Sequence, residues 1–238
     1  MAHAERATVR VGDVVLKIDP DLTRTDAEVE AMALAPVPTP EILWRHPPVL
    51  ALAALRGRAL GCLEEPSTAS PAAWRAAGAA VRTLHDAPLP PRPGHTLETL
   101  VARLADECAW LVAHDVLPVD VITRTRRLAE TALRPWAPVF VHGDLQITHV
   151  FVEGDEVTGI IDWSEAAAGD ALYDLATLTL AHGEHLDDLV AGYGAEVDLD
   201  VIRAWWSFRC LTAIRWLAGS GYGPPADMPE AGVLRSLA

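Results

Sequence analysis

Residues 139–163, VFVHGDLQITHVFVEGDEVTGIIDW, carry polar groups mainly where short apolar runs end. Asp144 follows a glycine directly after one apolar run, and Asp162 ends another, Gly159-Ile160-Ile161. A carboxylate at a strand end can accept a hydroxyl proton, bind Mg²⁺, or cap the turn or helix that follows. Taken alone, each aspartate therefore leaves a catalytic and a structural interpretation open.

The pair of aspartates is more specific than either residue. Asp144 and Asp162 lie eighteen positions apart, and a tight turn at Glu153-Gly154-Asp155 divides that interval. An antiparallel hairpin of this length returns its end beside its start, so we expect both carboxylates and His149 to converge. Two acids without a nearby cation repel each other, and a divalent metal would resolve that repulsion. The segment therefore predicts a site that combines a metal and a base.

A single lysine is the second candidate for chemistry. Lys and Arg together number 19, and Lys17 is the only Lys. Since arginine serves at every other cationic position, Lys17 marks either a site that needs a compact ammonium or a chance survivor on a strand. It lies between Leu16 and Ile18 and points to the opposite side of that strand.

The elements before residue 57 are short and mostly β. Apolar alternation around Gly12-Asp13 predicts a hairpin of Ala7–Val11 and Val14–Ile18. Residues 25–35 are typical of a short helix, with Thr25-Asp26-Ala27-Glu28 as a capping box. Two further strands are expected within EILWRHPPVLALAAL, residues 41–55. Together these short elements predict a small β-rich lobe, residues 1–56.

Helices dominate the rest of the chain, residues 57–238. Apolar periodicity and capping residues predict helices at 71–86, 96–114, 119–133 and 170–181, with two more helices closing the chain. The proline-rich stretch PLPPRPG at 88–94 forms a rigid connector. The fold class is therefore α+β, with a mainly helical C-terminal lobe that holds the hairpin 139–163.

Composition narrows the class of protein. Of 238 residues, 50% are hydrophobic and 22% are charged, which is typical of a globular protein. The formal net charge of −14 argues against a nucleic-acid surface. There is no long apolar run, no N-terminal signal segment, and no metal-type spacing among Cys62, Cys108 and Cys210. We expect a cytoplasmic protein with a small-molecule partner and with no membrane or nucleic-acid partner.

Two motifs resemble a known family. VHGDLQITHVFV, followed by GIIDWSEAAAGDALYDLA, is similar to the aminoglycoside phosphotransferase and choline kinase-like family, relatives of the protein kinases. That family's pattern is His-Gly-Asp, four residues, Asn, a hairpin, Ile-Asp-Trp, and Gly-Asp-Pro-x-x-Asp-Leu-Ala. The likeness extends to VVLK at 14–17 and LHDAPLP at 84–90, and so covers most of the chain. It implies a two-lobed protein kinase-like fold with a truncated N-terminal β lobe.

The resemblance implies a role for each candidate residue. Asp144 resembles the base that orients or deprotonates the substrate hydroxyl. Asp162 resembles the acid that holds Mg²⁺ against the phosphates of ATP or GTP. Lys17 resembles the phosphate-contacting lysine, and a helix glutamate should pair with it. Glu28 is favoured for that pair by its spacing, although the capping box competes for it, and Glu30 is the alternative.

Other positions receive supporting roles from the same resemblance. His142 would brace the loop by hydrogen bonds rather than react. Asp170 and Asp174 would cap and anchor the helix that follows. The backbone near Ala51–Ala53, between the lobes, would meet the edge of the adenine base.

Two departures from the family pattern affect activity. The family's Asn is His149 here, and imidazole nitrogen suits Mn²⁺, Co²⁺ or Zn²⁺ better than Mg²⁺. His149 is therefore a ligand for a softer metal, a hydrogen-bonding replacement, or a mark of lost activity. Gly12 is the only glycine before Gly57, so the chain lacks the sequence for a first strand and a glycine-containing loop over the phosphates. Either the true start lies upstream, or the phosphates are held without a lid.

Three functions remain in competition. The first is a phosphotransferase that moves a phosphoryl group from ATP or GTP to a hydroxyl of an aminoglycoside-like antibiotic or another metabolite. The second is a degenerate, non-catalytic relative that binds nucleotide or ligand. The third is a metallohydrolase that uses His142, Asp144, His149 and Asp162 as ligands.

The identity of the acceptor stays open at this level. Acidic helix faces could receive a polycation, or they are solvated surfaces; they include Asp106, Glu107, Asp115, Asp187 and Asp188. Late aromatics could line an acceptor pocket, or they belong to the core; they are Trp205, Trp206, Phe208 and Trp216.

Overall fold

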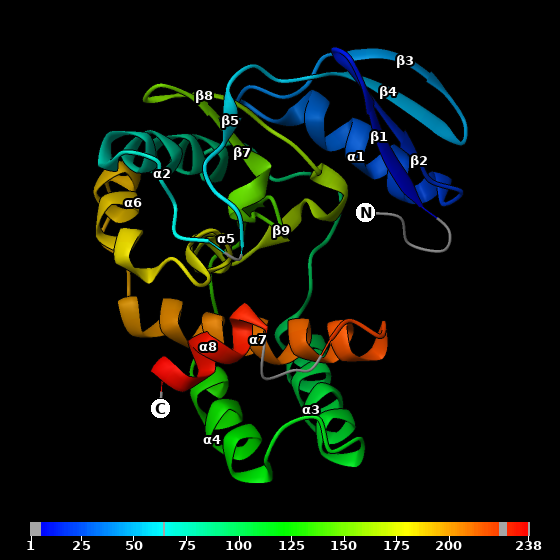
Figure 1. Ribbon diagram of the computed structural model, residues 1–238. Helices are drawn as coiled ribbons and strands as arrows, with labels where there is room; N and C mark the ends of the chain where they lie inside the picture. Colours follow the sequence, from blue (N-terminus) through cyan, green and yellow to red (C-terminus); the bar gives the residue numbers. More distant parts are fainter. Residues whose placement is uncertain (1–5, 64, 224–227, 238) are drawn as a thin grey trace.

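A four-stranded antiparallel sheet forms the smaller lobe in the computed structural model, which describes residues 6–63, 65–223 and 228–237. The strand order is β1-β2-β4-β3, with β1 Ala7–Val11, β2 Val14–Ile18, β3 Ile42–His46 and β4 Val49–Ala53. Helix α1 accompanies this sheet (Figure 1). The hairpin predicted at Gly12-Asp13 is confirmed, because Gly12 takes the left-handed φ of +59° that the turn needs.

Helix α1, Leu22–Leu34, begins three residues earlier than the sequence predicted. Asp21 is its N-cap, and one carboxylate oxygen accepts hydrogen bonds from the N–H groups of Thr23 and Arg24. Thr25 therefore lies inside the first turn, where its hydroxyl donates to the Asp21 carbonyl. The predicted capping box is wrong, and Glu28 keeps its carboxylate for a different partner.

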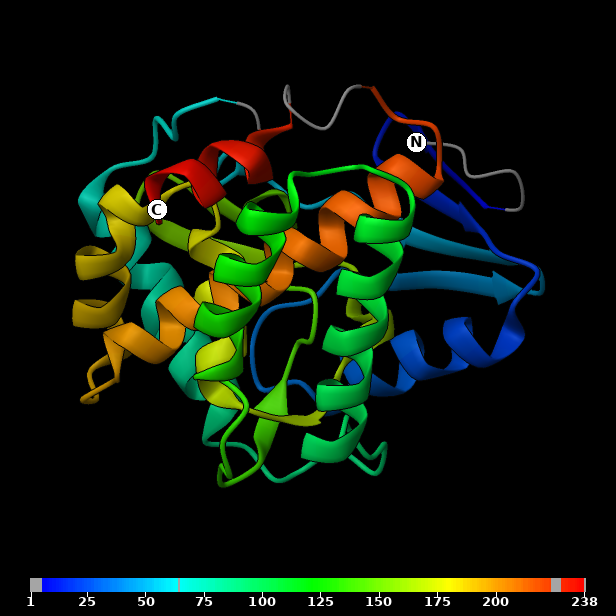
Figure 2. The same cartoon turned by 90° about the horizontal axis from the view of Figure 1, so that it is seen from below.

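The larger lobe is helical and surrounds one long helix. Helix α7, Leu199–Gly219, packs against α3, α4, α5 and α8. Figure 2 shows α7 in orange, with α3 and α4 in green across it. Trp205, Trp206 and Phe208 are buried on α7, which confirms that they belong to the core, whereas Trp216 is exposed. The other helices are α2 Pro71–His85, α3 Leu97–Ala113, α4 Val119–Glu130, α5 Ala171–Thr179, α6 Leu186–Tyr193 and α8 Pro229–Ser236.

Two differences from the predicted helices have local causes. Helix α4 ends at Glu130 rather than Leu133, because the following residues form turns in which Thr131, Ala132 and Leu133 bond to carbonyls three positions back. Three helices rather than two follow α5, since α8 starts separately with Pro229 at its first turn.

Residues 139–169, which include Asp144, His149 and Asp162, contribute strands to two small sheets. Strand β6, Val139–Val141, pairs with β9, Ala167–Gly169. The predicted hairpin is confirmed as β7, Val150–Glu153, and β8, Glu156–Ile160.

Strand β5, Arg58–Ala59, extends that hairpin on the β7 side. Gly57 lies directly before it with a φ of +79°, and a Cβ there would lie 2.1 Å from the Val152 carbonyl oxygen. Only glycine allows the chain to leave the sheet lobe at this closeness to β7.

The two lobes also meet through hydrogen bonds to backbone carbonyls. The Ile160 N–H donates to the Pro38 carbonyl, and the Thr158 hydroxyl donates to the Arg56 carbonyl. The α+β, two-lobed fold class is confirmed, while the division at residues 56 and 57 stays a prediction. Among the helices in the described ranges, none has the length and apolar character needed to cross a membrane.

Candidate active site

Lys17 is the hub of a three-residue cluster. Its Nζ lies 2.6 and 2.7 Å from the two carboxylate oxygens of Glu28 and 2.8 Å from Oδ1 of Asp162. Strand β2 supplies the lysine and α1 supplies the glutamate. Asp162 arrives from a segment 145 residues away. The structure therefore forms the pair expected of Lys17 and Glu28, and the alternative, Glu30, has no role in it.

Each member of this cluster titrates in a perturbed environment. Burial disfavours the Lys17 ammonium, but the carboxylates of Glu28 and Asp162 outweigh it and raise the Lys17 pKa. Burial raises the pKa of Glu28 even though Lys17 acts against it. For Asp162, burial is outweighed by Lys17 and His149, which lower its pKa to about 2. Asp162 is therefore a carboxylate throughout the physiological range.

Asp162 adopts an unusual backbone conformation. Its φ is 68° and its ψ is 58°, which is the left-handed region that non-glycine residues rarely occupy. Its side chain remains 42% exposed. Strain of this kind costs about 1–3 kcal/mol and persists where the surroundings hold it, often at functional sites. Here it turns the carboxylate toward Lys17 and away from the end of β8.

The loop His142–Asp144 is held by a buried carboxylate. Asp174, fully buried on α5, accepts hydrogen bonds from the N–H groups of His142 at 2.7 Å and Gly143 at 3.0 Å. His85 Nε2 also lies 3.3 Å from it, within the LHDAPLP segment. Asp174 thus anchors the loop as well as its own helix, whereas Asp170 caps α5 as expected by accepting from the Leu172 N–H.

His142 braces the same loop through both ring nitrogens. Its Nε2–H donates to the Ile161 carbonyl at 3.0 Å, and its Nδ1 accepts from the Asp144 N–H at 3.3 Å. Burial lowers the pKa of this ring, which favours the neutral form. Because neither nitrogen is free, His142 fits the bracing role and not the role of a metal ligand. Among the described residues, no group of three His, Cys, Asp or Glu side chains is arranged to hold a metal. The geometry does not support the metallohydrolase alternative.

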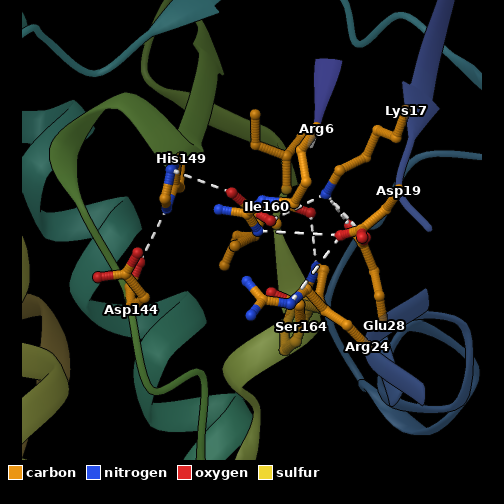
Figure 3. A network of polar contacts seen from close by, with 12 residues as sticks. Arg6, Lys17, Asp19, Arg24, Glu28, Asp144, His149, Ile160 and Ser164 are labelled. Carbon is orange, nitrogen blue, oxygen red and sulfur yellow. Dashed lines mark hydrogen bonds and ion pairs between the residues drawn. The ribbon is translucent and has the colours of Figure 1, made fainter. Parts of the chain in front are cut away.

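His149 presents one nitrogen to Asp162. Its Nδ1 lies 2.8 Å from the Asp144 carbonyl, so that nitrogen carries a proton, and Nε2 is the ring nitrogen on the side of Asp162. Nε2 lies 3.8 Å from Oδ2 of Asp162. Figure 3 shows His149 between the Lys17 group and Asp144. An imidazole nitrogen beside a carboxylate oxygen is a donor pair suited to a borderline cation such as Mn²⁺.

Asp144 has a partner that the sequence analysis missed. Its Oδ1 lies 2.8 Å from Arg209 Nη2 on α7, and Gln146 donates to both carboxylate oxygens. Burial opposes ionisation of Asp144, but Arg209 and His149 outweigh it and lower the pKa. Within the protein, each carboxylate therefore has its own cation, Lys17 for Asp162 and Arg209 for Asp144, and the metal expected at this site stays a prediction. The available signal in the sequence was an arginine among the buried apolar residues of α7.

Two other expectations about the site can be located in the structure. The adenine edge was expected near Ala51–Ala53; there Ala51 is buried within β4 between β2 and β3, the Ala53 N–H donates to the Glu41 carbonyl, and the contact with adenine stays a prediction. Among the acidic candidates, Glu107 contacts Arg103 and Arg215, and Asp188 pairs with Arg75. Of the five acidic candidates, these two are therefore already paired with arginines, and the choice between a polycation site and a solvated surface stays open.

The arrangement of the two lobes defines a class of protein. A strand lysine paired with a helix glutamate in a sheet lobe faces a helical lobe that carries the His-Gly-Asp loop, and this is the protein kinase-like fold. The model of the Phosphotransferase enzyme family matches residues 3–216. The chain belongs to this family.

Similar solved structures agree with the fold. The structure of the GDP complex of aminoglycoside 2'-phosphotransferase-IIIa has a TM-score of 0.76 and 17% identity, covering 99% of this chain and 90% of that one. A choline/ethanolamine kinase family protein from Mesorhizobium loti has a TM-score of 0.72 and 23% identity, covering 99% and 85%. Macrolide 2'-phosphotransferase MphH from Brachybacterium faecium has a TM-score of 0.67 and 21% identity, covering 96% and 88%.

Proposed function

We propose that this protein is a small-molecule kinase that transfers a phosphoryl group from ATP or GTP to a hydroxyl group. The observation that carries the proposal is the bridge from Lys17 to both Glu28 and Asp162. Phosphoryl transfer depends on positioning and on stabilising phosphate charge, and an ammonium held by a glutamate beside a metal-binding acid supplies both.

Asp162 and His149 are the residues we assign to a metal ion. The free carboxylate oxygen and Nε2 are 3.8 Å apart and belong to a partly open site. The metal would neutralise phosphate charge, and the mixed oxygen and nitrogen donor set extends the choice from Mg²⁺ to Mn²⁺.

Asp144 is the residue we assign to the acceptor hydroxyl. Its side chain is 27% exposed, so a hydroxyl can reach it, and its backbone is fixed by His142, Gly143 and their contacts to Asp174. A lowered pKa makes it a carboxylate that orients a hydroxyl by accepting its hydrogen bond.

A second candidate is a non-catalytic relative that binds nucleotide without transferring phosphate. It is favoured by one observation, the ion pair that Arg209 already makes with Asp144. A base whose charge is neutralised by a guanidinium is weaker than a free carboxylate. Transfer to hydroxylated compounds decides between the two, because both candidates bind nucleotide.

Calorimetric titration with ATP and GTP, in Mg²⁺ or Mn²⁺, tests the proposal. Lys17→Ala and Asp162→Ala should abolish metal-dependent nucleotide binding, while Asp144→Ala should retain binding and lose transfer. Asp188→Ala is the control, since among the described residues Asp188 forms its ion pair with Arg75, a contact between α6 and α2 that does not involve Lys17, Asp144 or Asp162. Equal nucleotide affinity in all four variants would overturn the proposal.

A further inference from the structure

Arg209 shares an accessible face with the carboxylate of Asp144. The two side chains are 65 residues apart in the sequence and meet at 2.8 Å, with 16% of the arginine and 27% of the aspartate exposed. Both groups are therefore within reach of the same small molecule. Any hydroxyl that approaches Asp144 also meets the guanidinium.

The guanidinium is fixed in place but not saturated with hydrogen-bond acceptors. Nη1 donates to the Tyr173 hydroxyl at 3.1 Å, and the group lies 5.7 Å from the centre of the Tyr173 ring. Arginine has five N–H donors, and the described residues accept from two of them, with Nε buried and unpartnered. The remaining Nη hydrogens form part of a planar fork that matches an oxyanion.

A positive charge, the guanidinium of Arg209, lies beside the proposed base Asp144 in a protein that is acidic as a whole. The formal net charge is −14, yet Arg209 cancels the charge of Asp144 at the point of the proposed chemistry. Glu107, an acid on the neighbouring α3, is occupied by Arg103 and Arg215. Because its charge is already cancelled, Asp144 offers little attraction to a polycation, whereas the Nη hydrogens of Arg209 that lack an acceptor can still bind an oxyanion.

We propose that Arg209 determines acceptor specificity, and that the acceptor carries an oxyanion, either carboxylate or phosphate, close to its reactive hydroxyl. The oxyanion binds the free donors of Arg209 while the hydroxyl lies against Asp144. This inference rests on the proposed role of Asp144 as the residue that receives the acceptor. It excludes aminoglycosides as the preferred substrates.

A matched set of three-carbon compounds tests the charge preference. Glycerate and glycerol 3-phosphate carry the two oxyanions, glycerol is neutral, and 2-amino-1,3-propanediol is cationic. Each is titrated into the full chain at constant ionic strength while the arginine side-chain NMR signals are followed. The two oxyanions should shift the Arg209 signal saturably, and the neutral and cationic compounds should not. Stronger binding of glycerate or of glycerol 3-phosphate then identifies which oxyanion fits.

Variants of helix α7 separate recognition from stability. Arg209→Met should weaken oxyanion binding roughly tenfold to a hundredfold, because hydrogen bonds to a charged group are lost. Arg209→Lys keeps the charge and should retain part of the binding. Arg203→Met is the matched control, since Arg203 lies on the same helix and its one ion pair within the described part of the chain is with exposed Asp200.

Three results would overturn this inference. They are an absence of oxyanion binding by the wild-type chain, equal binding of all four compounds, and oxyanion binding that survives Arg209→Met. The titration uses no nucleotide, so it fails or succeeds independently of the proposed kinase activity. If Lys17→Ala loses nucleotide binding and keeps oxyanion binding, both the nucleotide site and the acceptor site are supported. If the wild-type chain binds oxyanions but never nucleotide, the proposed kinase activity is refuted and the oxyanion site is not.

Discussion

Asp174→Asn replaces one oxygen of the buried carboxylate with an NH₂ group. That carboxylate holds the His142–Asp144 loop by hydrogen bonds. The carboxylate is fully buried and accepts from His142 N–H at 2.7 Å, Gly143 N–H at 3.0 Å and His85 Nε2 at 3.3 Å. Asparagine has the same shape but only one acceptor oxygen. Oriented to keep the bonds to His142 and His85, its NH₂ group faces the Gly143 N–H.

The cost of Asp174→Asn follows from the groups left unpaired. Losing a hydrogen bond to a charged group removes about 1.5–3 kcal/mol, and leaving a buried N–H unsatisfied costs about 1–3 kcal/mol. The expected loss is therefore about 2.5–6 kcal/mol. For a chain of 238 residues, each kcal/mol lowers Tm by about 2–4 °C, so Tm should fall by about 5–24 °C.

Thermal and urea unfolding of wild-type and variant protein measure this loss directly. The control is Asp188→Asn, which removes a half-exposed pair with Arg75 and should cost no more than about 1 kcal/mol. If Asp174→Asn is no more destabilising than Asp188→Asn, then the buried carboxylate does not hold the loop, and the reasoning about its three donors is wrong.

Three further predictions address the metal, pH and backbone. His149→Asn should lower the affinity for Mn²⁺ relative to Mg²⁺ in the presence of nucleotide, measured by electron paramagnetic resonance of free Mn²⁺, and an unchanged ratio would contradict the donor assignment. The pKa of Asp162 is lowered to about 2, so its stabilisation is present above the unfolded value of about 3.9 and lost as pH falls through 2. The difference in Tm between wild type and Asp162→Asn should therefore shrink as pH falls from about 3.9 to about 2. A difference that stays constant over this range would show that the ion pair with Lys17 is not its cause. Gly57→Ala should cost about 2–5 kcal/mol in urea unfolding, because a left-handed φ and a 2.1 Å approach to a carbonyl both oppose it. Gly12→Ala, which meets only the left-handed φ, should cost about 1–2 kcal/mol, and equal losses would contradict the close approach.

Local chemistry explains which elements the sequence predicted well. The hairpin of β1 and β2 depends on Gly12 and on alternating apolar residues, and both signals lie within a few positions. The start of α1 was misplaced because two capping patterns overlap, and Asp21 precedes Thr25 along the chain. A carboxylate at the first available N-cap lets the helix begin earlier.

Long-range contacts explain what the sequence could not predict. The pair of Lys17 and Glu28 was expected only through the family resemblance, since spacing alone also allowed Glu30. The ion pair of Asp144 with Arg209 depends on how α7 crosses the helical lobe, and no local pattern encodes that crossing. An arginine in a helix of high apolar content was the one visible trace of it.

A crystal structure with Mn²⁺ and a non-hydrolysable ATP analogue tests the central assignment most directly. We expect anomalous scattering from Mn²⁺ at bonding distance from Oδ2 of Asp162 and Nε2 of His149, with Lys17 still held by Glu28 and its ammonium against the phosphates. Manganese and phosphates bound away from Asp162, with the contact between Lys17 and Asp162 unchanged, would contradict the account.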